Sequence, residues 1–107
     1  MVKGILINTN GTYQWVDTHK LKDLQELVGG YIQELVPNDH FTTYINEEAI
    51  PKELQKNVLG KRVLEALEYS IPYDIYGPIL MYGRINESGD ETPFPEDQLW
   101  KIEKILK

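Results

Sequence analysis

Apolar and polar positions alternate at the start of the chain, and this pattern predicts a β-hairpin over residues 3 to 17. Ile5 and Ile7 fall on one face of an extended segment and Leu6 on the other. Asn10-Gly11 then interrupts the pattern, and this dipeptide favours a tight hairpin turn because both residues tolerate positive φ. The β-branched and aromatic residues after it are typical of the returning strand.

The apolar spacing then changes to a helical period, in a segment that Asp17 or Thr18 is expected to cap. Leu21, Leu24 and Val28 lie on one side of this helix. The pair Gly29-Gly30 allows two interpretations of where it ends. A helix that continues to Leu35 would contain two interior glycines, which destabilise it by roughly 2 kcal/mol relative to alanine.

A helix that ends near Val28 places glycine where the left-handed conformation is needed. We favour this second interpretation because of the next segments of the chain. A turn at residues 37 to 39 precedes a strand-like segment at 41 to 46, and a strand needs a neighbour. Residues 31 to 36 are therefore predicted to form that neighbouring strand.

Pro51 breaks the regular pattern, and Asn57 is expected to cap a second helix. The buried side of this helix is predicted to hold Leu59, Val63, Ala66 and Leu67. An aromatic loop at residues 69 to 76 leads to a continuous apolar run at 79 to 85, which indicates a strand buried on both faces.

Pro95, Glu96 and Asp97 are predicted to begin a last helix, and Lys101, Lys104 and Lys107 to end it, in agreement with the helix dipole. Its core face is expected to consist of Leu99, Ile102 and Leu106, broadened by Trp100 or Ile105. The elements together predict a single α+β domain over residues 1 to 107. Their order is β-β-α-β-β-α-β-α, with the helices packed on a mainly antiparallel sheet.

Composition places the chain among ordinary globular domains, with 41% hydrophobic and 26% charged residues. Apolar runs are too short to span a bilayer, so no membrane insertion is expected. The first residues do not have the pattern of a secretory signal and the chain has no cysteine, and together these features indicate a cytoplasmic protein. The net charge of -6 opposes direct binding to nucleic acid and suits a soluble protein, a basic protein partner or imitation of nucleic acid.

The segments "LQELVGGYI", "YINEE" and "GPILMYG" resemble the domain-of-unknown-function family numbered thirty-eight forty-six, which is found largely in phages, plasmids and other mobile elements. The resemblance covers roughly residues 3 to 85. Ala49-Ile50 departs from the family pattern, in which a glycine usually comes after the paired glutamates. The matching positions are Gly29, Gly30, Tyr31, Asn46, Glu47, Glu48, Asn57, Gly77 and Pro78. The resemblance implies a small protein that acts inside a bacterial host and modulates host machinery or host defence.

Tyrosine is unusually frequent, with seven copies, and three of them lie close together at Tyr69, Tyr73 and Tyr76. Tyrosine offers a large contact area with a polar tip, so this loop is a candidate binding surface. The alternative is a lid over the core. Arg62 and Arg84, the two arginines of the chain, could hold an anion together or form ordinary surface ion pairs.

Acidic side chains are frequent near the end of the chain, and they could meet a basic protein surface or simply form a solvated loop. They are Glu87, Asp90, Glu91, Glu96 and Asp97. Neither His19 nor His40 has a companion at metal-ligand spacing, and no motif of an activated serine is present, so no metal, cofactor or catalytic residue is predicted.

These features support two main hypotheses. The first is a non-enzymatic protein that binds a host protein through the tyrosine loop, the acidic run or a sheet edge. The second is a small-molecule or nucleotide sponge, with Arg62, Arg84 and the tyrosines lining a pocket between the protomers of an oligomer such as a dimer. A small enzyme is the third and least favoured.

Overall fold

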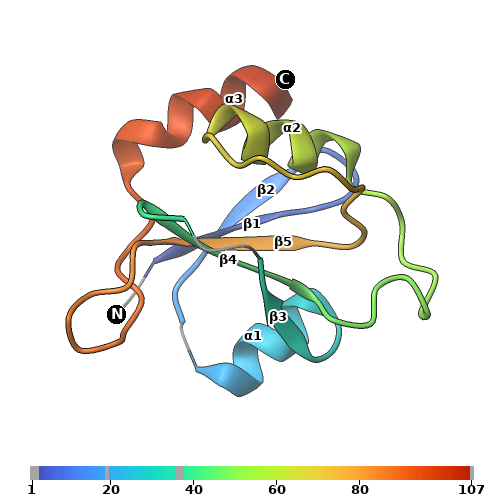
Figure 1. The fold of residues 1–107 in the computed structure, drawn as a ribbon, viewed down its shortest axis with the longest axis horizontal. Helices are drawn as coiled ribbons and strands as arrows, with labels where there is room; N and C mark the ends of the chain where they lie inside the picture. The colour runs from blue at the N-terminus through green and yellow to red at the C-terminus, as the bar shows by residue number, and fades with distance from the viewer. Residues whose placement is uncertain (1–2, 19, 36–37, 107) are drawn as a thin grey trace.

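The computed structural model describes residues 3–18, 20–35 and 38–106, which form one antiparallel sheet with helices on both faces (Figure 1). Five strands lie in the order β2-β1-β5-β4-β3. Their bounds are Gly4–Ile7 for β1, Tyr13–Val16 for β2, Ile32–Glu34 for β3, Phe41–Asn46 for β4 and Ile79–Gly83 for β5. The helices are α1 (Leu21–Val28), α2 (Val58–Ala66) and α3 (Leu99–Leu106), and a short 3₁₀ turn, η1 (Glu96–Gln98), precedes α3. The predicted α+β class and element order are confirmed.

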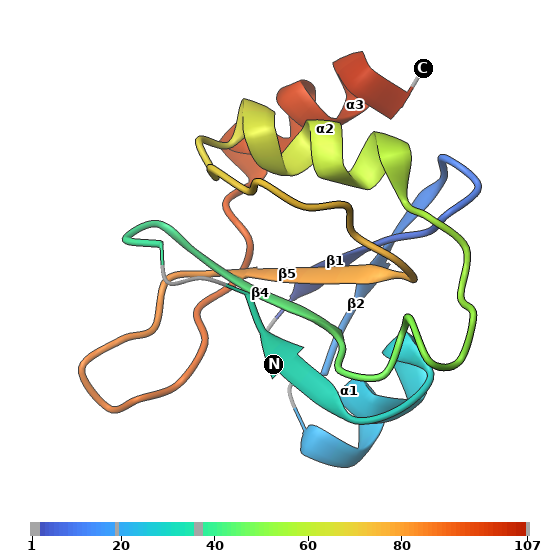
Figure 2. The ribbon, with the colours of Figure 1, turned by 45° about the vertical axis from the view of Figure 1, so that its right-hand side comes forward.

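Helices α2 and α3 cover one face of the sheet, and α1 covers the other (Figure 2). Strand β5 lies at the centre, between β1 and β4, and all five of its residues are buried. The prediction of a strand covered on both faces is therefore confirmed. It ends at Gly83, two residues earlier than expected, and Ile85 is 42% exposed. None of the helices in the described ranges is long and apolar enough to cross a membrane.

The predicted hairpin is present, with Ile7 of β1 opposite Tyr13 of β2. The predicted cap of α1 is wrong, because the helix begins later and Lys20 occupies the capping position without a side-chain hydrogen bond. Thr18 instead donates its hydroxyl to the Asp23 carboxylate at 2.7 Å and accepts the Lys20 amide. Asp17 is exposed.

The glycine pair ends α1, in agreement with the favoured interpretation. Gly29 has a φ of 85°, in the left-handed region, and the amides of Gly29 and Gly30 both donate to the Gln25 carbonyl at 2.9 Å. The chain then enters β3, which begins one residue later than predicted and ends at Glu34. Val36 of the predicted strand and Pro37 of the predicted turn lie outside the described residues.

Asn57 caps α2 as predicted, and its side chain accepts the Gly60 amide. The expected buried side of this helix is partly wrong, because Ala66 is exposed while Leu64 is fully buried. Each residue rotates by about 100° around a helix, so Ala66 points away from the face on which Leu64 and Leu67 lie.

The last helix begins as the 3₁₀ turn η1 and continues as α3, in which Ile102 is fully buried. Ile105 broadens the core face, whereas Trp100 is 59% exposed and does not contribute to it. Lys107, the last of the three predicted terminal lysines, lies outside the described residues.

Four tyrosine hydroxyls sit in surroundings that disfavour the phenolate. Burial, and then the hydrogen bond to Glu91, raise the pKa of Tyr44. Burial, and then the charges of Glu91 and Asp23, raise the pKa of Tyr82, whose hydroxyl donates to the Thr18 carbonyl. The pKa of Tyr69 is raised by burial and that of Tyr13 by its hydrogen bond to Glu103.

We expect the free energy of unfolding to fall steeply above about pH 10. The unfolded chain loses its phenol protons there, while the folded chain keeps them. The unfolded state then binds fewer protons than the folded state, so the free energy of unfolding decreases as the pH rises. Tyr44 and Tyr82, whose pKa values are raised most, each contribute a slope of up to about 1.4 kcal/mol per pH unit. Urea unfolding at pH 8, 10 and 11 measures this slope. Tyr44→Phe should reduce it, and an equal reduction by Tyr31→Phe, at a side chain that is 63% exposed, would contradict the explanation.

Candidate functional site

Two hydrogen-bonded junctions explain most of the positions that match the family motifs. At the first, the buried Asn46 donates its side-chain amide to the Val28 carbonyl at the end of α1, at 3.0 Å. Its side-chain oxygen accepts the Glu48 amide at 2.7 Å. Asn46 therefore fixes both the glycine end of α1 and the turn after β4.

At the second junction, the fully buried Asn57 connects three segments. Its side-chain amide donates to the Ile7 carbonyl at 3.2 Å and to the Gly77 carbonyl at 2.9 Å, while its oxygen accepts the Gly60 amide at 2.9 Å. Gly77 has a φ of 83°, which favours glycine. These motif residues hold the fold together and leave little of their surface for a ligand.

The other motif positions have separate surroundings. Glu47 donates its amide to the Tyr31 carbonyl at 2.8 Å, and the Tyr31 side chain extends into solvent. Glu48 forms an ion pair with Lys52 at 3.7 Å. Pro78 is half-buried just before β5.

The three loop tyrosines do not act as one surface. Tyr69 is buried, and its hydroxyl forms a hydrogen bond with the Thr43 hydroxyl at 2.8 Å, so it belongs to the core, as the lid alternative predicts. Tyr73 is 48% exposed and Tyr76 is half-buried. Both line a hollow of about 240 Å³ between this loop and the segment after β4. Ile45 and Ile50 also line this hollow. We call this hollow the tyrosine groove.

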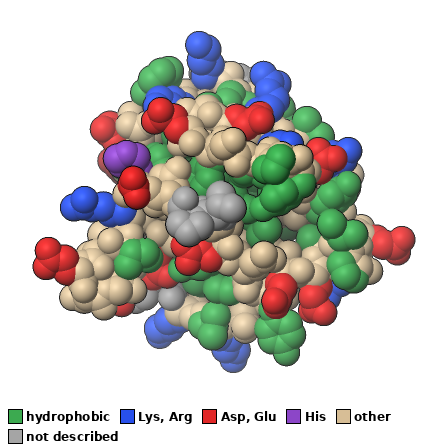
Figure 3. Space-filling view, in the orientation of Figure 1, with side chains coloured by type: hydrophobic (Ala, Val, Ile, Leu, Met, Phe, Trp, Pro, Cys, Tyr) green, Lys and Arg blue, Asp and Glu red, His purple; other side chains and the backbone are tan. Residues whose placement is uncertain are grey.

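Hydrophobic side chains gather on the side of the molecule where the segment between β4 and α2 lies (Figure 3). Ile50 in this segment is 69% exposed. Large apolar side chains that share one exposed hollow are a feature of protein-binding surfaces.

The two arginines are not brought together. Arg62 lines a small hollow beside the start of α2, together with Lys56 and Asp74, whereas Arg84 lines a different and larger cleft after β5. Within one chain the two arginines therefore do not form a shared anion site, because they line different hollows.

The acidic run is also divided. Glu87 and Asp90 are exposed in the loop after β5, while Glu91 accepts the Tyr44 hydroxyl at 2.5 Å and holds this loop against the sheet. Glu96 is exposed in η1, and Asp97 lines the same cleft as Arg84. The run does not form one continuous acidic surface.

The larger cleft has a volume of about 510 Å³ and lies among the start of β4, the end of β5, the end of α2 and the beginning of the last helix. The register of the sheet explains its position. Phe41 pairs with Gly83, so the next residues outward, His40 and Arg84, reach the same end of the sheet. We call this hollow the charged cleft.

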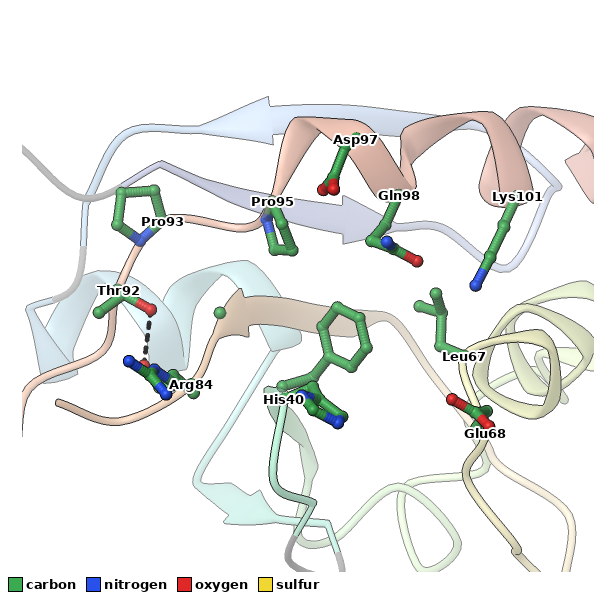
Figure 4. A pocket seen from close by; sticks show the side chains of 12 residues that line it. His40, Leu67, Glu68, Arg84, Thr92, Pro93, Pro95, Asp97, Gln98 and Lys101 are labelled. Carbon is green, nitrogen blue, oxygen red and sulfur yellow. Dashed lines mark hydrogen bonds between the residues drawn. The ribbon is translucent and has the colours of Figure 1, made fainter.

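Five ionisable side chains line the charged cleft: His40, Glu68, Arg84, Asp97 and Lys101. In Figure 4, Lys101 reaches in from α3, Glu68 and His40 lie along the opposite rim, and Arg84 lies at the other end beside Thr92. None of the five forms an ion pair with another residue in the described part of the chain. Sequence patterns point only to Arg84 and Asp97 of this set, since no local pattern links the segments.

The described residues contain no cluster of three or more histidine or acidic side chains that could hold a metal ion. His40 lies in the charged cleft, and His19 lies outside the described residues. We take the tyrosine groove and the charged cleft as the candidate sites, because the first holds the exposed predicted tyrosines and the second holds five ionisable side chains without an ion pair among the described residues.

Comparisons with known proteins agree with the resemblance noted from the sequence. No curated protein and no solved structure matches the chain. A family model described as "Domain of unknown function (DUF3846)" matches residues 2–107, a longer range than the quoted motifs cover. The chain therefore belongs to this family of domains of unknown function.

Proposed function

We propose that this protein is a non-enzymatic binding protein that engages a host protein, including one of host defence, in the cytoplasm of a bacterial host. The setting, a phage or another mobile element, rests on the resemblance of its motifs. The observation that carries the binding role is the exposure of Ile50 and Tyr73 in one hollow, at 69% and 48%.

The chemistry of the tyrosine groove suggests which kind of partner surface fits it. Ile45 and Ile50 offer apolar contacts, while the hydroxyls of Tyr73 and Tyr76 offer polar ones. An apolar or aromatic side chain of the partner would enter such a hollow as an anchor. The net charge of -6 favours a partner with basic residues around this anchor, because opposite charges speed association.

We expect Ile50→Asp to abolish capture of the partner, because it places a charge in the groove without disturbing the buried core. The measurement is native mass spectrometry of the protein purified from a bacterial host lysate, which also reports whether the protein is a monomer or a dimer. The double variant Tyr73→Ala, Tyr76→Ala should give the same loss.

Leu21→Asp is the matched control, because it also replaces an exposed aliphatic side chain by aspartate, at a position that is 59% exposed on α1. Aspartate is well tolerated in the first turn of a helix. Equal loss of the partner in Ile50→Asp and Leu21→Asp, or no loss in either, would contradict the assignment to the tyrosine groove.

A second candidate function is binding of a small molecule, as the sponge hypothesis expects, and the charged cleft is the observation that favours it. Its volume of about 510 Å³ lies within the range of about 300 to 1,000 Å³ that is typical of small-molecule sites. The site differs from the predicted one, since Arg84 is accompanied by Lys101 and two carboxylates rather than by Arg62 and the tyrosines.

A further inference from the structure

We propose that the charged cleft binds a zwitterionic small molecule with an apolar body, of the class of unprotected short peptides and apolar amino acids. This proposal rests on the second candidate function, small-molecule binding, and names its ligand. Three properties of the cleft carry it: the balance of its charges, their separation and its apolar floor.

The charges of the cleft cancel. Arg84 and Lys101 supply two positive groups, and Glu68 and Asp97 supply two negative ones. Glu68, Arg84 and Asp97 are exposed and none of the four groups forms an ion pair with a described residue, so a ligand that pairs with them brings an acceptor and a donor of its own. A carboxylate and an ammonium group on one molecule meet this requirement.

The groups are also arranged around the cleft rather than gathered at one point. Arg84 lies at one end, beside Thr92, while Glu68 and Lys101 lie toward the other (Figure 4). A ligand with charges at its two ends can therefore contact Arg84 with its carboxylate and Glu68 with its ammonium group. A phosphate ester of a nucleotide would face the carboxylates of Glu68 and Asp97, and like charges repel.

Between the charged ends the cleft is lined by apolar side chains. Phe41 is buried at the start of β4, and Leu67 and Pro95 lie beside it. Such a floor favours an apolar or aromatic side chain on the ligand, because burial of apolar surface contributes favourably to binding.

Glu68 occupies an unusual backbone position. It comes after α2 with a φ of 71°, in the left-handed region. Its amide donates to the Glu65 carbonyl at 3.1 Å, and the next amide, of Tyr69, donates to the Leu64 carbonyl at 3.0 Å. Glycine is the residue that fits this helix end best. The glutamate therefore places a carboxylate at the cleft where local conformation alone would favour glycine.

Glu53 provides a matched position elsewhere. It has a φ of 57°, its amide donates to the Ile50 carbonyl at 2.9 Å, and the Leu54 amide donates to the Ala49 carbonyl at 2.9 Å. Its backbone hydrogen-bond pattern is the same as that of Glu68 and its φ is also in the left-handed region, but it does not line the charged cleft. The two glutamates therefore separate the effect of backbone conformation from the effect of the carboxylate in the cleft.

Calorimetric titration of the full chain tests the proposal. The probes are a panel of unprotected dipeptides of leucine, phenylalanine, valine and tyrosine, with adenosine 5′-monophosphate as the nucleotide. We expect at least one dipeptide to bind, and its N-acetylated and C-amidated forms to bind at least tenfold more weakly, because each lacks one charge. The nucleotide should also bind at least tenfold more weakly.

Glu68→Gly should weaken binding of the best dipeptide at least tenfold without further weakening the N-acetylated form, while Glu53→Gly binds like the wild type. Both variants should raise the midpoint of thermal unfolding, which shows that the loss of binding is not a loss of folding. Equal binding of the dipeptide and its N-acetylated form, or unchanged binding in Glu68→Gly, would overturn the proposal.

The same probes distinguish a failure of the zwitterionic ligand from a failure of small-molecule binding by the cleft. If the nucleotide binds to the wild type more tightly than every dipeptide, and Lys101→Gln abolishes that binding, the zwitterionic ligand is refuted while the small-molecule function of the cleft stands. If neither the dipeptides nor the nucleotide bind, both are overturned.

Discussion

Replacement of Asn57 by alanine is expected to lower the free energy of unfolding by about 3 kcal/mol or more. The substitution removes the cap of α2 and at the same time leaves the carbonyls of Ile7 and Gly77 without their side-chain donor. A lost helix cap costs about 1 kcal/mol, and each buried polar group left unsatisfied costs about 1 to 3 kcal/mol. Urea unfolding monitored by circular dichroism measures the change.

Two variants isolate the cause. Asn57→Ser keeps an oxygen that can cap α2 but cannot reach both carbonyls as a donor, so its loss should be smaller by about 1 kcal/mol. Asn86→Ala removes an asparagine whose oxygen accepts the Ser88 and Asp90 amides in an exposed loop, and it should cost no more than about 0.5 kcal/mol. The role of Asn57 as a connector would be refuted if its loss were as small as that of Asn86.

Phe94→Ala is expected to have an effect of similar or greater size, about 3 to 5 kcal/mol. The ring is 2% exposed, stacks on Phe41 with their centroids 5.6 Å apart and meets Trp15 edge-on at 6.3 Å. Its removal leaves a cavity between the sheet and the segment that leads to α3. The midpoint of urea unfolding should fall while the dependence on urea concentration stays constant.

The control for Phe94 is Trp100→Ala, which deletes a larger ring from α3 at a position that is 59% exposed. Its expected cost is about 0.5 kcal/mol or less. A loss in Trp100→Ala as large as that in Phe94→Ala would mean that buried contacts are not the reason for the effect. Phe41, on which Phe94 stacks, also lines the charged cleft. Phe94→Ala should therefore also lower the affinity of the cleft for any ligand that binds there.

Local patterns were sufficient to predict most elements of this fold. The hairpin turn, the glycines after α1 and the cap at Asn57 each depend on neighbours within a few residues, and each is present. The predicted cap of α1 is wrong because the suitable capping residues, Asp17 and Thr18, come too early: the helix begins only at Leu21. The importance of Phe94 was not predicted, since a phenylalanine between two prolines belongs to no periodic pattern.

The charged cleft could not be predicted for a different reason. Its rim residues come from four separate segments, and they meet only because the pairing of β4 with β5 brings His40 and Arg84 to one end of the sheet. Glu68 could not be selected from the sequence either, because its distinguishing feature is a left-handed backbone conformation at a residue other than glycine, which only the structure shows. Asn57 was predicted as a cap, but its contacts to Ile7 and Gly77 depend on long-range packing.

The position of β5 has a consequence for how the chain folds. The hairpin of β1 and β2 and the hairpin of β3 and β4 can each form early from neighbouring residues, but β5 must insert between them to complete the sheet. Until residues 79–83 emerge from the ribosome, the inner edges of β1 and β4 have no partner. Unpaired apolar edges invite association with other chains. Synthesis of the last quarter of the chain is therefore the interval in which chaperones would matter most.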